Sequence, residues 1–192
     1  SYTTGVHQTN SHPLQTLPDS KRWNRFIRFN LSSVISSQAS RRLPPSGSLF
    51  CYVLTTPKYH ASRVLAVNRT WLSDCDHGEF FSTFPQLAAD DDKFAVRSSV
   101  PFSFVFEKIP DDYAFLFHKS IASLRFLYQR YPNFDWYYKA DDDTFVIVEN
   151  LRLFLAKHDA EEPLYMGFRM KPYLKHGYNS GGAGYVLSRA AL

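Results

Sequence analysis

Three consecutive aspartates, Asp141, Asp142 and Asp143, lie between two apolar runs in the stretch WYYKADDDTFVIVENL. Neighbouring carboxylates repel one another, so a positive partner must compensate them wherever they are buried. On extended backbone the side chains of Asp141 and Asp143 would share a face, and that of Asp142 would point away. Two carboxylates on one face form a hard oxygen site for Mg²⁺ or Mn²⁺, with positions left open for substrate phosphates.

A solvated acidic turn is the alternative interpretation of such a triplet, because aspartate is common in loops. That interpretation suits the acidic run at residues 90–92, which lies in a polar stretch. The triplet at residues 141–143 differs, since it follows a strand-like apolar run and precedes a helical pattern. Its position therefore favours a ligand site.

A glycine-rich segment, SGGAGYVL at residues 180–187, is the second candidate. Glycine lets the backbone pass close to a ligand or adopt a positive φ. A tight turn before a helix explains the segment equally well. The segment is neither a P-loop, since no Gly-Lys-Ser/Thr follows, nor a dinucleotide fingerprint, since its spacing differs.

The loop FRMKPYLKHGY, which begins at Phe168, carries basic residues among tyrosines. Bases or phosphates could bind Arg169, Lys171, Lys175 and His176, although composition alone favours a solvated basic loop. Nucleophile and metal motifs of the G-x-S-x-G and H-E-x-x-H types do not occur in the sequence. The chemistry indicated is therefore binding of a cation and an anionic ligand.

Composition fits one folded domain: the chain has 192 residues, of which 44% are hydrophobic and 17% aromatic. The formal net charge of +4 would favour an anionic ligand but predicts no nucleic-acid partner. No apolar run approaches the roughly 18 residues of a membrane span, so we expect a soluble chain. Its start at Ser1 suggests a processed, trimmed or incomplete end.

Cysteines and sequons bear on the cellular compartment. Cys51 and Cys75 could form a disulfide or remain two buried thiols, and composition leaves both open. N-glycosylation sequons at Asn30 and Asn68 favour a secretory lumen.

The elements that must position these residues begin near residue 49. Residues 1–47 are polar and interrupted by prolines, and we expect a partly disordered stalk or linker. Strands are expected over residues 49–56, 79–84, 100–109, 134–140 and 163–168, and helices over 60–72, 111–131 and 147–157. This alternation predicts an α/β domain with a largely parallel sheet, whose ligands bind at the carboxyl ends of the strands.

The helix expected over residues 111–131 has the clearest periodicity. An apolar stripe recurs at steps of four and three, through Phe117, Ile121, Leu124, Tyr128 and Tyr131. Asp111 and Asp112 lie at its start, where the helix dipole favours negative charge.

Several blocks closely resemble the core 1 β-1,3-galactosyltransferase group of the fringe-like β-1,3-glycosyltransferases. They are the aromatic-Lys-Ala-Asp-Asp-Asp-Thr block, the Asn-Leu-Arg after it, the Lys-Pro-Tyr, and Ser-Gly-Gly-Ala-Gly-Tyr-Val-Leu-Ser. The resemblance covers roughly residues 49–192. It implies a Rossmann-like GT-A fold whose C-terminal part is missing, with residues 48–192 as its donor-binding part. It also implies a disulfide between Cys51 and Cys75.

The activity implied is an inverting transfer of galactose from UDP-galactose, in β-1,3 linkage, to GalNAc on Ser/Thr of a glycoprotein. The enzyme would be a type II Golgi membrane protein with a lumenal catalytic domain, whose anchor is outside this chain, and a possible homodimer. Mn²⁺ would be bound by Asp143, with Asp141 assisting. The implied donor-binding residues are Thr55, Thr56, Asp141, Asp142, Arg169, Lys171, Gly181, Gly182, Ala183 and Gly184.

The sequence departs from this group in two respects. The group's base, a carboxylate in a Glu-Asp motif after the glycine loop, and a metal-binding histidine beyond it do not occur before Leu192; Glu149, Glu161 and Glu162 are poorly placed substitutes. Asn68 replaces a usual Lys or Arg. Three interpretations remain: part of an active enzyme, an inactive truncated paralogue that acts as a binding or chaperone-like partner, and a fringe-like transferase of other specificity.

Overall fold

A computed structural model describes residues 47–84, 100–171 and 174–192 of the chain. The stalk expected over residues 1–47 lies outside the described residues except for Gly47. The Asn30 sequon and the acidic run at residues 90–92 also lie outside them.

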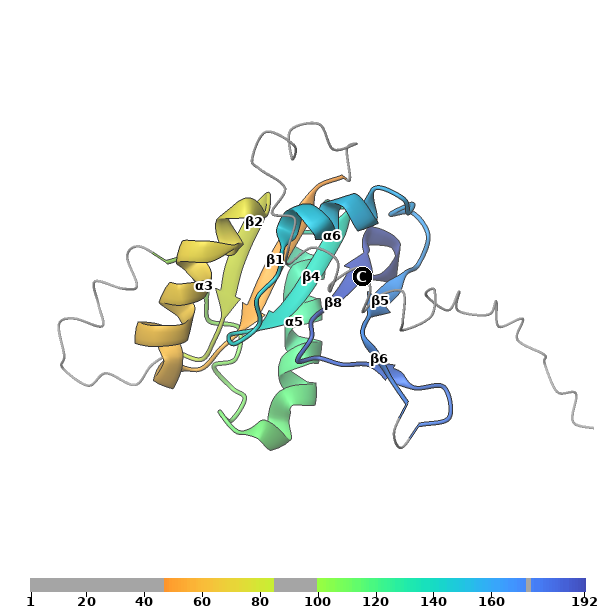
Figure 1. Ribbon diagram of the computed structural model, residues 1–192. Coiled ribbons are helices and arrows are strands. Elements are labelled where there is room, and N and C mark those ends of the chain that lie inside the picture. The colour runs from red at the N-terminus through yellow and green to blue at the C-terminus, as the bar shows by residue number, and fades with distance from the viewer. Residues whose placement is uncertain (1–46, 85–99, 172–173) are drawn as a thin grey trace, which may run out of the picture.

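A six-stranded sheet forms the centre of the described structure, in the order β3-β2-β1-β4-β8-β5 (Figure 1). Its strands are β1 (Leu49–Leu54), β2 (His77–Phe81), β3 (Phe102–Ser103), β4 (Trp136–Asp141), β5 (Tyr165–Gly167) and β8 (Tyr185–Ser188). The strands β1 to β4 pair in parallel, whereas β8 is antiparallel to β4 and β5. The α/β class is confirmed, but the sheet is mixed rather than largely parallel.

Helices cover both faces of this sheet. The helical segments are a π-helical turn (His60–Val64) that runs into α3 (Leu65–Thr70), then α5 (Leu116–Arg130) and α6 (Val148–Leu155). Single 3₁₀ turns occur at Pro57–Tyr59, Leu72–Asp74, Tyr113–Phe115 and Arg189–Ala191. The helices α3 and α6 share one apolar core with the sheet, and α5 shares a second core on the opposite face (Figure 1).

The strand β1 is buried along its whole length. Its side chains alternate between the two cores, with Leu49, Cys51 and Val53 in one and Phe50, Tyr52 and Leu54 in the other. A strand covered on both faces has no polar side, which is why its sequence is a continuous apolar run. The buried strand predicted over residues 49–56 is therefore confirmed.

Two statements about secondary structure need correction. The strand expected over residues 100–109 shortens to β3, because the chain turns at once: the amide of Val105 donates to the carbonyl of Ser103. The alternative interpretation of the glycine-rich segment, a tight turn before a helix, is wrong, because the segment leads directly into β8. A four-residue run gives no periodicity that would separate a strand from a helical turn.

The predicted apolar stripe of α5 is wrong at two positions. The side chains of Phe117 and Tyr128 are 71% and 66% exposed. The buried positions are Lys119, Ser123 and Leu127 instead. Polar residues can face inward here because their groups find partners: the Ser123 hydroxyl donates to the carbonyl of Lys119, and the Lys119 ammonium pairs with Asp111.

A disulfide joins Cys51 of β1 to Cys75, which precedes β2. It confirms the implied pairing. The bond links neighbouring parallel strands across the segment that contains α3, at a sequence separation of 24 residues. The disulfide therefore closes the connection between β1 and β2, which includes Thr55 and Arg63.

Glu79 of β2 is a buried carboxylate on the α5 side of the sheet. Its oxygens accept hydrogen bonds from the hydroxyls of Tyr131 (2.6 Å) and Ser103 (2.8 Å), and Nε2 of His77 lies 2.8 Å away. These partners compensate the desolvation of the carboxylate. The hydrogen bond to Glu79, followed by burial, raises the pKa of Tyr131 to about 12.

Within residues 47–84, 100–171 and 174–192, no helix combines the length and the apolar character needed to cross a bilayer.

Candidate functional site

The carboxyl ends of β1 and β4 meet at one edge of the sheet, and the aspartate triplet lies there. Leu54 of β1 is in register with Asp141, the last residue of β4. The next residues along each chain, Thr55 and Asp142, are joined by a 2.7 Å hydrogen bond from the Thr55 hydroxyl. The prediction that the triplet lies at the carboxyl edge, where α/β sheets bind ligands, is confirmed.

The three carboxylates have different partners. Asp141 pairs with the ammonium of Lys139, and the buried Asp142 accepts a 2.8 Å hydrogen bond from Nη1 of Arg63. Asp143 has its carboxylate 3.2 Å from the same nitrogen. The side chain of Asp142 is 7% exposed and that of Asp143 is 62% exposed. Asp143 is therefore the most exposed carboxylate of the triplet, since the side chain of Asp141 is 35% exposed.

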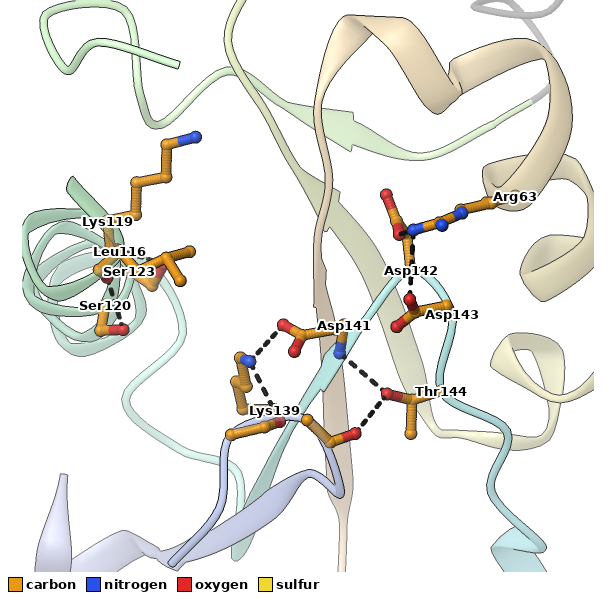
Figure 2. Close-up of polar contacts among 12 residues, drawn as sticks. Arg63, Leu116, Lys119, Ser120, Ser123, Lys139, Asp141, Asp142, Asp143 and Thr144 are labelled. Carbon is orange, nitrogen blue, oxygen red and sulfur yellow. Dashed lines mark hydrogen bonds and ion pairs between the residues drawn. The ribbon is translucent and has the colours of Figure 1, made fainter. Parts of the chain in front are cut away.

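The expectation that Asp141 and Asp143 share a face is wrong. Only Asp141 belongs to the strand, and residues 142–143 form a turn in which side chains no longer alternate. Figure 2 shows Asp142 and Asp143 both directed at Arg63, whereas Asp141 is directed toward Lys139.

Arg63 and Lys139 are the positive groups that compensate the triplet. The guanidinium of Arg63 lies 4.0 Å from the centre of the Tyr59 ring, which holds it beside the acidic turn. The hydrogen bond to Asp142 raises the pKa of Arg63, so the group stays charged. Sequence reasoning does not single out Arg63, because it lies 79 residues from Asp142. The available signal is topological: the helical turn after β1 begins at the same sheet edge.

The glycine loop, residues 180–184, is attached to the triplet by its backbone. The buried ammonium of Lys139 donates to the carbonyl of Gly181 at 3.2 Å. The Thr144 hydroxyl donates to the carbonyl of Gly182 at 2.9 Å and lies 3.3 Å from the amide of Asp141 (Figure 2). The structure thus brings together two segments that the sequence singles out separately.

Gly184 ends this loop at a position that only glycine fits. Its φ is +77°, and a Cβ there would lie 2.4 Å from the Tyr138 hydroxyl. Burial, and then the charge of Asp141, raise the pKa of Tyr138 well above its ordinary value, so this hydroxyl stays protonated. The loop therefore packs directly against β4.

Comparison with known proteins fits this arrangement. The family profile described as Fringe-like matches residues 46–192. The chain belongs to the Fringe-like family. The α/β architecture and the acidic turn at the sheet edge are consistent with the GT-A glycosyltransferase fold predicted from the sequence.

Three relatives of this Fringe-like chain have names that differ in the enzyme they describe. Over 157 residues it is 34% identical to glycoprotein-N-acetylgalactosamine 3-beta-galactosyltransferase 1 of Xenopus laevis, covering 81% of this chain and 40% of the relative. It is 28% identical over 148 residues to the beta-1,3-glucosyltransferase of Mus musculus, covering 75% of this chain and 28% of that protein. It is 29% identical over 172 residues to chondroitin sulfate synthase 3 of Mus musculus, covering 82% and 19%. The chain thus spans less than half the length of each.

Other residues implied as donor-binding are placed less centrally in the Fringe-like chain. The side chain of Arg169 donates to the carbonyl of His176 across the antiparallel hairpin of β6 (Arg169–Met170) and β7 (Tyr178–Asn179). Lys171 is exposed just after β6. No contact within the described residues joins either side chain to the triplet. Thr56, in contrast, directly follows Thr55, and its backbone carbonyl accepts a hydrogen bond from the Tyr59 amide at the start of the next turn.

The glutamates and the sequon lie apart from the site. Glu149 is in α6, and Glu161 pairs with Arg189 beyond the end of β8. Asn68 is partly exposed within α3, and the Thr70 hydroxyl of its sequon donates to the carbonyl of Ala66 at 2.7 Å.

The residues of the site would suit an open metal position rather than a closed cage. Across the parts of the chain that the structure describes, no group of three or more His, Cys, Asp or Glu side chains could hold a metal ion. Mg²⁺ and Mn²⁺ instead commonly bind to one or two carboxylates and complete their shell with water and phosphates. Asp143 suits that role, because it is exposed and has a single long contact. Asp141 is already engaged by Lys139.

Proposed function

We propose that this Fringe-like chain is the donor-binding part of an inverting β-1,3-galactosyltransferase. It would use UDP-galactose and transfer galactose to GalNAc on Ser/Thr of a glycoprotein. The observation that carries the proposal is the exposed carboxylate of Asp143 at the shared end of β1 and β4, beside a glycine loop fixed by Lys139 and Thr144. The similarity to the Xenopus laevis relative supports galactose as the sugar.

Glycosyl transfer from a nucleotide sugar builds negative charge on the departing diphosphate. A bound Mn²⁺ would supply the positive charge that stabilises it. Asp143 would hold the ion, and Thr55 and Thr56 would lie beside the uridine at the end of β1. The backbone of residues 181–184, Ala183 included, would face the sugar and diphosphate, since Gly182 leaves open space there.

The setting proposed is the Golgi lumen, with a membrane anchor in the full-length protein. The disulfide between Cys51 and Cys75 supports an oxidising compartment, where such bonds persist.

Transfer of another sugar is the second candidate. The relatives named as a beta-1,3-glucosyltransferase and as a chondroitin sulfate synthase favour it. Galactose and glucose differ in one hydroxyl, which is axial in galactose and equatorial in glucose. Buried polar groups that bind such a hydroxyl discriminate strongly between two sugars.

The test is calorimetric titration of the chain with UDP, UDP-galactose and UDP-glucose, in Mn²⁺ and then in EDTA. We expect binding only with Mn²⁺, with UDP-galactose bound more tightly than UDP-glucose. The Asp143→Asn variant should lose metal-dependent binding. The control is Asp159→Asn, an exposed site where asparagine can still accept from the Glu161 amide.

Three results would overturn the proposal. A folded wild-type chain that binds no nucleotide would argue for an inactive paralogue. Equal affinity in EDTA would remove the metal. Tighter binding of UDP-glucose would favour the second candidate.

A further inference from the structure

Arg63 makes two unequal contacts with the triplet from the same nitrogen. Its Nη1 lies 2.8 Å from Oδ1 of Asp142 and 3.2 Å from Oδ2 of Asp143. Asp142 is buried and also accepts from Thr55, so leaving it unpaired would be costly. Asp143 is exposed, and a long contact to an exposed carboxylate contributes little. The first contact is an anchor and the second is weak.

Asp143 has no other partner of this kind. Within the described residues, Arg63 is the one side chain that forms a hydrogen bond or ion pair with it. Asp141 is taken by Lys139, and Asp142 by Thr55 and Arg63. A cation that binds Asp143 would therefore lie close to the Arg63 guanidinium, and the two positive charges would repel each other.

We propose that Arg63 is a counter-ion that competes with the divalent cation for Asp143 and then favours the diphosphate that follows. The proposal rests on the proposed function, which supplies the metal and the nucleotide. While the metal is absent, Arg63 lowers the repulsion between Asp142 and Asp143. When a divalent cation binds Asp143, two positive groups lie side by side, and each weakens the binding of the other.

Arg63 should weaken the binding of the metal alone but strengthen the binding of the negatively charged diphosphate. We expect Arg63 to stay at the site, because Asp142 and the Tyr59 ring still contact it. Its charge then lies next to an incoming anion, to which guanidinium groups bind well. Arg63 is thus expected to oppose the metal alone and to favour the nucleotide once the metal is bound.

The test measures these two affinities separately in Arg63→Gln. Free Mn²⁺ is followed by electron paramagnetic resonance during titration without nucleotide, and UDP is titrated calorimetrically at saturating Mn²⁺. We expect Mn²⁺ to bind about twofold to fivefold more tightly, which is the strength of an exposed ion pair. UDP should bind about tenfold more weakly, the loss of a charged hydrogen bond.

Arg189→Gln is a matched control. Arg189 also contacts two carboxylates, Asp135 and Glu161, and its side chain is 38% exposed against 39% for Arg63. Arg189 lies next to Asp135, at the end of β4 opposite to the triplet. Both affinities should equal those of the wild type.

A second variant guards against misfolding, since Arg63→Gln leaves the buried Asp142 without its cation. The double variant Arg63→Gln/Asp142→Asn removes both charges and keeps Asp143. Its reference is the single variant Asp142→Asn, which keeps Arg63, and the double variant should bind Mn²⁺ more tightly than that reference. Mn²⁺ binding that is unchanged or weaker in each folded Arg63 variant than in its own reference overturns the inference while leaving the proposed function standing. A wild-type chain that binds neither Mn²⁺ nor UDP overturns the proposed function itself.

Discussion

Lys139 and Asp141 form an ion pair two residues apart on the same strand, directly beside the glycine loop. Residues two apart on a strand point to the same side of the sheet, so the pair needs no distant element to bring it together. The Lys139 ammonium also donates to the carbonyl of Gly181. One buried side chain thus connects the acidic turn with the loop that would face the donor.

Replacing this lysine should loosen the loop. We expect Lys139→Met to lower the free energy of unfolding by about 2 kcal/mol, because Asp141 loses its cation and the Gly181 carbonyl loses its donor. Chemical denaturation measures the loss, and hydrogen exchange of the amides in residues 181–184 measures the loop. Protection that stays at the wild-type level would contradict an anchoring role for Lys139.

The conformation of Gly184 gives a second prediction. Gly184→Ala should destabilise the fold by about 2 kcal/mol or more, because φ is positive and the new Cβ would strike the Tyr138 hydroxyl. Gly182→Ala is the control, since its Cβ would meet nothing within 4 Å. Urea unfolding of both variants checks the difference. Equal stabilities would mean that the loop relaxes freely.

The disulfide should contribute substantially to stability. Cys51→Ala/Cys75→Ala is expected to cost about 3 kcal/mol, given the 24-residue separation that the bond closes. Thermal unfolding with and without dithiothreitol measures the effect. The wild type should lose stability on reduction and the variant should not change; a variant that still responds to the reductant would disprove this explanation.

The Tyr131–Glu79 hydrogen bond predicts a dependence on alkaline pH. The pKa of Tyr131 is about 12 in the folded chain, against 10.0 for an unperturbed tyrosine. Its contribution is complete below pH 10 and is lost as the pH rises toward 12, because the unfolded chain releases the proton first. Tyr131→Phe should therefore show a shallower loss of stability over this window in urea unfolding. Parallel slopes would exclude the contribution of Tyr131.

Part of this architecture could be predicted from local sequence. The buried β1, the strand that carries the triplet and the helix α6 all follow from apolar runs and periodicity. Which side of α5 faces the core could not be predicted, because Lys119 and Ser123 are buried with partners that composition does not reveal. The strand β8 could not either, since its identity depends on pairing with β4 and β5 rather than on its own four residues.

The candidate site was predictable in its parts but not in its contacts. The triplet and the glycine loop stand out as segments, and their contact through Thr144 and Lys139 appears only in the folded chain. Arg63 has no local signature, since it becomes a neighbour of the acidic turn only through the parallel pairing of β1 with β4.

The glycine loop is joined to Lys139 and Thr144 through its main-chain carbonyls, those of Gly181 and Gly182, and not through its own side chains. Every residue type has such a carbonyl, so the anchorage does not depend on which side chains the exposed positions carry. Residues 182 and 183 can therefore be diversified while the loop keeps its place, which makes them the first positions to randomise when a different sugar preference is sought.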